Sequence, residues 1–334
     1  MYKKIIDLKL LKDKSNYPIY AFLSISNICN ANCIFCDVHE NKCFKTCIDV
    51  YSILDQMKEI GIKYVHFTGG GEPFANRYIF EYIDYASKLG LNIIFLSNGI
   101  ALNKEKIDKI SQFNIKAIFF SLDSHLKEVH NKIRGVPGCF ENLSKAINYC
   151  KNKMPNVPII INHVLTNKNI EYLKDFINLK DKVKYDYLNP IIVKECPEFY
   201  FSKDQIKKFN QEKSEVVELA KDKNVKFLYD DINYFAENQY FDDGSDLRKN
   251  QVECNIPNYT CFIDCVSGYV YPCDCCCHRD QEYYSYGSLK NYTLKQLFEG
   301  NKFKQIQKEL KNKCSLCKSK CDYANVEFNK FIGE

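Results

Sequence analysis

The chain has 334 residues, a length that predicts two domains or one large α/β barrel with an appended module. Hydrophobic residues make up 46% and charged residues 27%, which excludes a disordered or fibrous protein. The 47 basic and 42 acidic side chains leave a net charge of only +5, too small and dispersed to predict binding of nucleic acid or an anionic membrane. No apolar run reaches the roughly 18 residues of a membrane helix, and Asp7 precedes any apolar segment, so we expect a cytoplasmic protein.

Eighteen cysteines set this composition apart. Because we expect a reducing compartment, their number indicates metal binding or redox chemistry, not disulfides. Five cysteines lie between residues 29 and 47, only three between 48 and 253, and ten between 254 and 321. The sequence therefore predicts a cysteine-poor scaffold with a cysteine-rich site towards each end.

The cysteine-poor part alternates between short apolar strands and amphipathic helices. Several strands are almost continuously apolar, which is typical of parallel strands buried on both faces. We expect strands at Tyr20–Ile25, Lys63–Phe67, Asn92–Leu96, Ala117–Leu122, Pro158–Leu165 and Lys184–Leu188. We expect helices at Asp49–Ile60, Asn76–Leu89, Lys104–Phe113, Phe140–Lys151, Asn169–Leu179 and Ser202–Lys223.

Six strand–helix repeats within about 200 residues predict an α/β fold, a partial (β/α)6 TIM-like barrel, with its site at the carboxyl ends of the strands. A small cysteine-rich module follows. The acidic, glycine-containing stretch Asp242–Ser245 indicates a linker before that module. We therefore predict an N-terminal extension at residues 1–17, the barrel at 18–237, a linker at 238–253 and the module at 254–334.

The first cysteine-rich site follows the first predicted strand as Cys29-x3-Cys33-x2-Cys36. Loops after barrel strands are where such folds place their chemistry. Three thiolates form an incomplete tetrahedral site. The missing ligand could be His39 or Cys43 around zinc, or the three thiolates could hold a [4Fe–4S] cluster with one open iron.

The other predicted strands also end in groups that can bind a ligand. After the second strand, Gly69–Gly71 allow close approach of the backbone and Glu72 can accept a hydrogen bond from an ammonium group. Hydroxyl and carboxylate groups suit a ribose, and a guanidinium suits a carboxylate. Those groups are Ser97 and Asn98 after the third strand, Ser121 and Asp123 after the fourth, and Arg134 beyond them.

With these residues in place, the sequence resembles the radical S-adenosylmethionine (SAM) superfamily over nearly its whole length. The resemblance implies that Cys29, Cys33 and Cys36 hold a [4Fe–4S] cluster and that Phe35 lies beside the adenine of the cofactor. It also implies contacts at every strand end. The methionine amine would be held by Gly70, Gly71 and Glu72, and the methionine carboxylate would pair with Arg134. The third-strand motif would consist of Ser97 and Asn98. The ribose would be approached by Ser121 and Asp123, and the adenine would be framed by Val164 and Leu165.

The same resemblance implies a reaction. Three thiolates leave one iron open for S-adenosylmethionine, so that an electron entering the cluster cleaves the sulfonium and releases a 5′-deoxyadenosyl radical, which abstracts hydrogen from a substrate. The electron would come from a flavodoxin-like or ferredoxin-like donor. We expect no general base or nucleophile, because the protein has only to position the substrate carbon and exclude water.

The C-terminal cysteines form a second pattern, Cys254-x13-Gly268-x4-Cys273 followed by Cys314-x2-Cys317. It resembles the SPASM and twitch modules of that superfamily, which implies one auxiliary [4Fe–4S] cluster, with Cys321 as an alternative ligand. A zinc ribbon is the alternative for these ligands. A second auxiliary cluster could use the remaining cysteines, Cys261, Cys265, Cys275, Cys276 and Cys277.

Local patterns predict the secondary structure between the C-terminal cysteines. Gly268–Cys273 is predicted to be a hairpin strand that leads to a ligand. The following helix, Leu294–Leu310, would return the chain to the last cysteines. The sequence predicts neither the oligomeric state nor the roles of Cys43 and Cys47.

Two histidines lie close to the predicted site. His66 is in the middle of a strand, so we expect a packed side chain and not a metal ligand. His130 precedes Arg134 on a short helix, where it either contacts the cofactor region or is solvated.

The resemblance also indicates a substrate class. Ser121–Arg134, followed by Gly138–Phe140, resembles the peptide-modifying branch of the superfamily. This implies a peptide or protein substrate that is crosslinked, epimerised or oxidised. The alternative is a small-molecule alcohol, sugar or aminocyclitol. A non-enzymatic iron–sulfur electron carrier is the remote alternative, since such a carrier needs no Gly-Gly-Glu-Pro segment.

Overall fold

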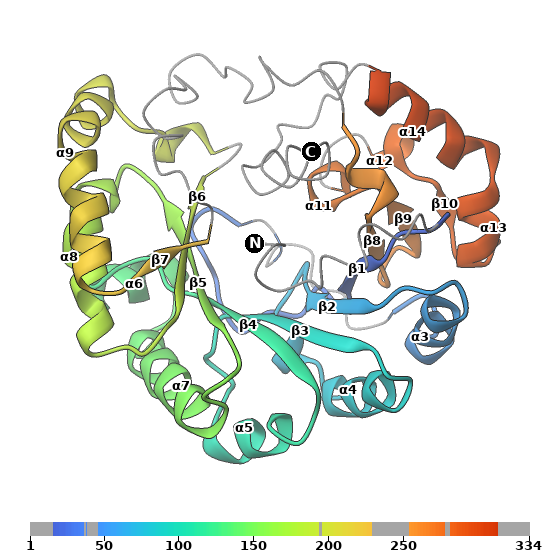
Figure 1. Cartoon of the computed structure of the whole chain (residues 1–334), viewed down its shortest axis with the longest axis horizontal. Coiled ribbons are helices and arrows are strands. Elements are labelled where there is room, and N and C mark those ends of the chain that lie inside the picture. Colours follow the sequence, from blue (N-terminus) through green and yellow to red (C-terminus); the bar gives the residue numbers. More distant parts are fainter. Residues whose placement is uncertain are drawn as a thin grey trace.

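The structure, a computed structural model, describes residues 16–36, 38, 46–193, 196–228, 254–277 and 281–312. Six parallel strands, each paired with the next in the chain, form the wall of a partial barrel (Figure 1). Their carboxyl ends therefore all lie at one edge. The strands are β1 (Tyr20–Ser24), β2 (Tyr64–Thr68), β3 (Asn92–Ser97), β4 (Ile115–Ser121), β5 (Ile159–Leu165) and β6 (Tyr187–Ile192).

Helices cover the outer face of this wall, which confirms the predicted fold class (Figure 1). The helix α3 buries Val50, Ile53, Leu54 and Met57, which recur at helical spacing, and Asp49 caps it by accepting a hydrogen bond from a backbone N–H. The covering helices are α3 (Val50–Glu59), α4 (Ile79–Lys88), α5 (Lys104–Ile110), α6 (Lys127–Arg134), α7 (Cys139–Lys153) and α8 (Leu173–Asn178), with 3-10 turns η2 (Pro73–Ala75), η3 (Ile170–Tyr172), η4 (Leu179–Asp181) and η5 (Pro197–Phe199).

The sixth strand begins later than the predicted range Lys184–Leu188. The backbone N–H of Lys184 donates to the side chain of Asn148 at 2.8 Å and not to a neighbouring strand. The short strand β7 (Lys226–Phe227) pairs only with Tyr187 and Leu188 of β6. Beyond that level the described residues give β6 no further partner on the side of β7, so the missing N–H of Pro190 leaves no described sheet hydrogen bond unmade.

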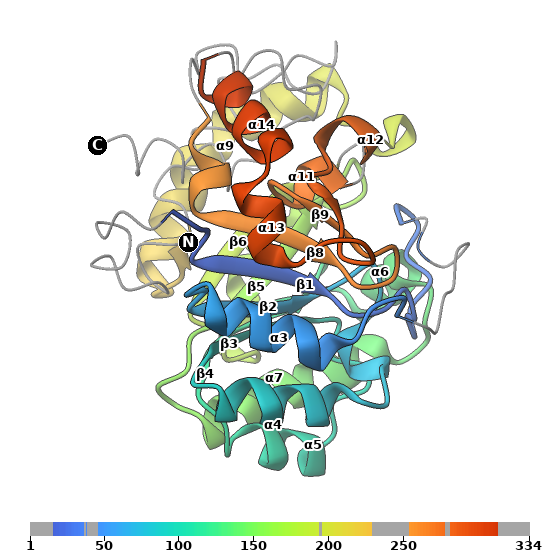
Figure 2. The same cartoon turned by 90° about the vertical axis from the view of Figure 1, so that its right-hand side faces the viewer.

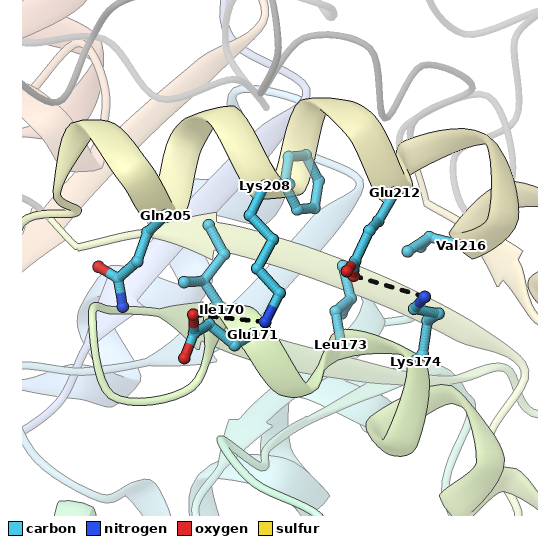
Figure 3. A pocket seen from close by; sticks show the side chains of 9 residues that line it. Ile170, Glu171, Leu173, Lys174, Gln205, Lys208, Glu212 and Val216 are labelled. Carbon is cyan, nitrogen blue, oxygen red and sulfur yellow. Dashed lines mark ion pairs between the residues drawn. The ribbon is translucent and has the colours of Figure 1, made fainter.

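The helix α9 (Lys203–Asp222) packs on η3 and α8, with a shallow pocket between them (Figure 3). The apolar side chains of Leu173 and Phe209 line the pocket. At its rim the Nζ atom of Lys208 lies 3.6 Å from Oε1 of Glu171. Because solvent-exposed ion pairs contribute little, the apolar contact is what holds α9 in place.

A strand from the C-terminal region continues the barrel sheet beyond β1. The strand β8 (Thr260–Asp264) pairs in parallel with all of β1, from Tyr20 opposite Thr260 to Ser24 opposite Asp264 (Figure 2). The strands β9 (Tyr269–Tyr271) and β10 (Gly287–Ser288) add antiparallel pairs, so the ten described strands form one sheet in the order β10-β9-β8-β1-β2-β3-β4-β5-β6-β7. The hairpin strand is confirmed, but its continuity with the barrel sheet was not predicted.

The predicted helix Leu294–Leu310 is wrong as a single element. Gly300 adopts an extended conformation, with φ −69° and ψ 159°, and separates two helices. The predicted linker, residues 238–253, lies outside the described residues, so the domain boundaries stay predictions. No helix in the described ranges is long and apolar enough to cross a membrane. The C-terminal helices are η6 (Ile256–Asn258), α11 (Asp274–Cys277), α12 (Gln281–Tyr284), α13 (Leu294–Glu299) and α14 (Asn301–Asn312).

Aromatic side chains surround His66 within the barrel. Its ring lies 5.3 Å from the rings of Phe22 and Phe119, and its Nδ1 atom is 2.8 Å from the hydroxyl oxygen of Tyr20. His66 is buried, which confirms the expectation of a packed side chain. Burial disfavours the imidazolium form and lowers the pKa of His66 to about 3.

The buried histidines predict a pH-dependent stability. Burial lowers the pKa values of His130 and His163 to about 4 as well, whereas an unfolded chain binds these protons near pH 6.5. The free energy of unfolding should therefore be greatest above pH 6.5 and fall towards pH 4, by up to about 1.4 kcal/mol per pH unit for each histidine. Urea unfolding at pH 7.5, 6.5 and 5.5 measures this slope.

The substitution His66→Gln provides the matched variant, since glutamine can still accept a hydrogen bond from Tyr20. It should remove about one histidine's share of the slope between pH 6.5 and 5.5. Equal slopes for the two proteins would contradict a neutral, buried His66.

Candidate functional site

The parallel strands bring the predicted site residues to one edge of the barrel. Each predicted group follows the strand to which the sequence assigned it, because consecutive parallel strands all end on the same side. After β1 comes the loop of Cys29, Cys33 and Cys36, and after β2 come Gly70, Gly71 and Glu72. At the end of β3 lie Ser97 and Asn98, and at the end of β4 lie Ser121 and Asp123. Arg134 is the last residue of α6.

Two glycines after β2 lie against the segment that leads into the cysteine loop. A Cβ atom on Gly70 would overlap the side chain of Asn27, and one on Gly71 would overlap the carbonyl group of Ile28. The N–H of Gly71 donates to the carbonyl oxygen of Ser26 at 2.9 Å. These glycines are therefore required for the close packing of two backbones, in addition to any contact with a ligand.

The carboxylate of Glu72 joins the ends of β2 and β3. Its Oε1 atom accepts hydrogen bonds from the hydroxyl of Ser97 at 2.8 Å and from the N–H of Phe74 at 3.1 Å. Its Oε2 atom accepts from the N–H of Asn98 at 2.6 Å. Burial raises the pKa of Glu72, although these three donors oppose the shift. Its contact with an ammonium group stays a prediction.

Asn98 connects this network to the first cysteine. Its Nδ2 atom donates to Oδ1 of Asn30 at 2.7 Å and lies 3.9 Å from Sγ of Cys29. The sulfur of Cys29 also accepts from the N–H of Ala31 at 3.4 Å. Burial raises the pKa of Cys29, and the hydrogen bond from Ala31 opposes that rise. Two neutral donors are thus directed at this sulfur.

The end of α6 holds the other side of the cysteine loop. The carbonyl oxygens of Ile133 and Arg134 accept hydrogen bonds from the N–H groups of Ile34 at 3.0 Å and Asn32 at 2.9 Å. Gly135 then takes a left-handed conformation, with φ +65°, and a Cβ atom there would overlap the carbonyl group of Asn32. The loop therefore satisfies carbonyls that a helix end leaves without partners.

A buried ion pair connects β4 to α6. The Nε atom of Arg134 lies 2.6 Å from Oδ2 of Asp123, and the Oδ1 atom of Asp123 accepts from the N–H of Val164 at 3.0 Å. Asp123 is fully buried and Arg134 is 8% exposed. Burial lowers the pKa of Arg134, but the charges and hydrogen bonds of Asp123 and Cys33 together outweigh burial and raise this pKa above its usual value. The predicted ribose contact of Asp123 stays a prediction.

The guanidinium of Arg134 also faces the cysteine loop. Its Nη1 atom donates to Sγ of Cys33 at 3.6 Å. Its Cζ atom lies 5.7 Å from the centre of the Phe35 ring, within the range of a cation–π contact. Arg134 thus contacts the loop through one sulfur and one aromatic ring.

Two neutral histidines lie beside Asp123. The backbone N–H of Asp123 donates to Nδ1 of His130 at 3.2 Å, so this nitrogen is unprotonated. The Nδ1 atom of His163 is 3.0 Å from the carbonyl oxygen of Leu122, which can only accept, so this nitrogen carries the proton. His130 is 1% exposed, and the expectation that it is solvated is wrong.

The fifth strand ends beside the same edge. Side chains alternate along β5, so Val164 and Leu165 point to opposite faces. Leu165 is fully buried in the hydrophobic core, and the predicted contact of Val164 and Leu165 with an adenine stays a prediction. The side chains of Val164 and of Ser121, at the end of β4, remain half-buried at the site edge.

The C-terminal cysteines gather around one buried tyrosine. The hydroxyl of Tyr286 is buried and has no hydrogen-bond partner among the residues that the structure describes. Burial raises the pKa of Tyr286 well above its usual value, and the thiols of Cys276, Cys261, Cys273 and Cys254 raise it further. The sulfur atoms of Cys273 and Cys276 are 3.5 Å apart. Their Cys-x2-Cys spacing is the sequence signal that would have identified Cys276 as more than a spare.

Other predicted ligands are not placed by the structure. Cys47 is exposed, and its N–H donates to the carbonyl of Cys265 at 2.9 Å. Across the described ranges, no three His, Cys, Asp or Glu side chains are arranged to hold a metal ion. The predicted ligands Cys314, Cys317 and Cys321, together with His39 and Cys43, lie outside the described residues.

The glycine contact predicts a selective effect of one methyl group. Gly71→Ala should lower the free energy of unfolding by about 1–3 kcal/mol, because the new Cβ meets rigid backbone. It should also speed alkylation of Cys29 in the metal-free protein, measured by mass spectrometry. Gly61→Ala is the control: it strains a left-handed backbone, at φ +89°, but its Cβ meets open space, so it should leave the alkylation of Cys29 unchanged. Unchanged alkylation in Gly71→Ala would contradict the packing role.

Family models match both cysteine-rich sites. The Radical SAM superfamily model matches residues 23–179, and the SPASM model, an iron–sulfur cluster-binding domain, matches residues 254–322. The first range contains the cysteine loop and the ends of β1 to β5. The second contains every predicted C-terminal ligand.

Curated relatives match part of the chain. The AdoMet-dependent heme synthase of Oleidesulfovibrio alaskensis is 31% identical over 128 residues, 38% of this chain and 32% of that protein. The mycofactocin maturase MftC of Mycobacterium ulcerans is 27% identical over 172 residues, 49% of this chain and 45% of that protein. The matched part of the chain thus spans less than half the length of these relatives.

A solved structure shares the fold. The crystal structure of Streptococcus suis SuiB bound to S-adenosylmethionine has a TM-score of 0.67, with 16% identity, and covers 90% of this chain and 70% of that one. The chain belongs to the radical SAM superfamily and carries a SPASM-type iron–sulfur cluster-binding domain.

Proposed function

We propose that this protein is a radical SAM enzyme that reductively cleaves S-adenosylmethionine to a 5′-deoxyadenosyl radical and abstracts hydrogen from a peptide or protein substrate. The observation that carries the proposal is the loop of Cys29, Cys33 and Cys36, held on both sides at the carboxyl ends of the strands. Both family-model matches support it.

The donor set fits a [4Fe–4S] cluster. N–H groups are directed at the sulfurs of Cys29 and Cys33, as is common for thiolates that bind iron–sulfur clusters. The buried, unpartnered hydroxyl of Tyr286 amid four thiols fits a second such group. When bound, a cluster with one open iron supplies the electron that breaks the sulfonium bond.

The residues of the chain would divide the remaining tasks. The backbone of Gly70 and Gly71, with Glu72, would hold the methionine amine. Ser121 lies half-buried at the end of β4, where it can reach a ribose, and Phe35 would flank the adenine. Arg134 would pair with the methionine carboxylate. The buried walls of the barrel would exclude water from the reacting atoms.

We place one auxiliary [4Fe–4S] cluster in the C-terminal region, with Cys254 and Cys273 among its ligands. Its position C-terminal to the barrel supports a role in substrate turnover, as acceptor of the electron left on a substrate radical. A second auxiliary cluster remains the alternative arrangement. The further candidate ligands are Cys314, Cys317, Cys321, Cys261 and Cys276.

Names of relatives support a peptide substrate. One match is a mycofactocin maturase and another a PqqA peptide cyclase, and SuiB has been crystallised with the precursor peptide SuiA. The heme synthases among the relatives favour the alternative, a small molecule. A short precursor-peptide gene beside this one, whose product stimulates 5′-deoxyadenosine formation, would support the first. Sugar-modifying genes there would support the second.

The reaction also needs a one-electron donor. We propose a flavodoxin-like or ferredoxin-like protein, since these supply single electrons at low potential. The many cysteines suit the reducing cytoplasm, where we place the reaction.

The barrel cysteines should be required for radical formation but not for binding of the auxiliary cluster. The triple substitution Cys29→Ala, Cys33→Ala and Cys36→Ala should reduce the iron content of the anaerobically reconstituted protein from about eight to about four atoms per chain. Formation of 5′-deoxyadenosine with dithionite should fall to background, as measured by liquid chromatography. Stoichiometric zinc in the anaerobic wild-type protein would contradict the proposal.

An auxiliary ligand should affect product and not radical formation. Cys273→Ala should retain 5′-deoxyadenosine formation in the absence of substrate, because it leaves the barrel loop intact. It should lose most of the modified product once a substrate is supplied. Cys150→Ala is the matched control, since Cys150 lies on the buried face of α7. Full product formation without the auxiliary iron would refute the role.

A further inference from the structure

One positive charge is buried directly beside the cysteine loop. The Nη1 atom of Arg134 donates to the sulfur of Cys33 at 3.6 Å, while its Nε atom lies 2.6 Å from Oδ2 of Asp123. All three residues are buried, with exposed fractions of 8%, 9% and 0%. The charge is therefore little screened by water or salt.

Asp123 fixes where that charge lies. Its other carboxylate oxygen accepts from the N–H of Val164 at 3.0 Å, and its carbonyl oxygen accepts from Asn169 at 2.8 Å. The carboxylate thus cannot follow the guanidinium if Arg134 moves. Since an unpaired buried guanidinium costs several kcal/mol, the ion pair keeps Arg134 against Cys33 before any cofactor binds.

The three cysteines are therefore not equivalent. Among the described residues, the donors to Cys29 are the backbone amide of Ala31 and the side-chain amide of Asn98, both neutral. Cys33 accepts from a cation. Charge-assisted hydrogen bonds are roughly twice as strong as neutral ones, so the electrostatic effect on Cys33 is the larger.

We propose that Arg134, oriented by Asp123, raises the reduction potential of the iron–sulfur cluster held by Cys29, Cys33 and Cys36. This inference rests on the proposed function. Reduction adds one negative charge to a cluster, and a nearby cation together with an N–H···S hydrogen bond stabilises the more negative state. Arg134 acts on the electron-accepting step, apart from any contact with the cofactor carboxylate.

The geometry also predicts an order among variants. Arg134→Gln removes the cation but leaves the negative charge of Asp123, so the potential should fall most. In the double variant Asp123→Asn with Arg134→Gln both charges are absent, so the potential should lie between that of Arg134→Gln and the wild type. Arg134→Lys keeps the positive charge, but lysine lacks the planar guanidinium that bonds both partners. The reduction potential of this variant should therefore fall only slightly.

The test is a redox titration of the anaerobically reconstituted full chain, followed by electron paramagnetic resonance without S-adenosylmethionine. Leaving the cofactor out separates the effect on the cluster from any effect on cofactor binding. The triple barrel-cysteine variant supplies the auxiliary signal for subtraction. Lys132→Gln is the matched control, because Lys132 loses the same charge from the exposed face of α6.

At the wild-type midpoint potential, the ratio of reduced to oxidised barrel cluster should fall about tenfold in Arg134→Gln, the size of a charge-assisted hydrogen bond. It should be unchanged in Lys132→Gln. Equal ratios for Arg134→Gln and Lys132→Gln would overturn the inference while leaving the proposed function intact. A wild-type protein without a barrel cluster would instead refute the proposed function. If Arg134→Gln fails to fold, the neutral double variant and Arg134→Lys provide the same comparison.

Discussion

The site depends on a loop whose backbone is hydrogen-bonded by neighbours on both sides. Its entry is held by Gly71 and Glu72, and its middle by the last carbonyls of α6. Neither contact needs a metal, so the loop adopts its shape through the fold. A preorganised loop lowers the conformational entropy lost when a cluster binds. The same contacts explain why Gly71 and Gly135 cannot carry a Cβ atom.

Buried carboxylates join the strand ends that surround this loop. Glu72 connects β2 to β3, and Asp123 connects β4 to β5 and α6. Burying a carboxylate is unfavourable unless several donors surround it, and each has at least two here. These residues therefore shape the site as well as facing a cofactor. Replacing either one alters geometry first, so loss of activity in such a variant does not by itself identify a cofactor ligand.

Sequence reasoning could predict the residues that follow parallel strands, since topology alone collects them. It located the cysteine loop, Glu72 and Asn98 correctly, because their positions depend on local strand patterns. It missed β8, whose partner β1 lies 240 residues away in the register of Tyr20 with Thr260. It also could not show that Arg134 turns towards Cys33 and Asp123, because side-chain pairing across the barrel depends on packing. The break at Gly300 overrode an apolar periodicity that looked continuous.

The pairing of β1 with β8 also affects how the chain is made. The first strand leaves the ribosome early, and its second neighbour in the sheet follows about 240 residues later. At the usual rate of about 5–20 residues per second, roughly 10–50 s separate the two. During that time one edge of β1 has no sheet partner among the described strands and is open to wrong pairing. Completion of the sheet therefore waits for β8, whereas the cysteine loop does not, because its hydrogen-bond partners at Gly71, Glu72 and the end of α6 are made long before β8.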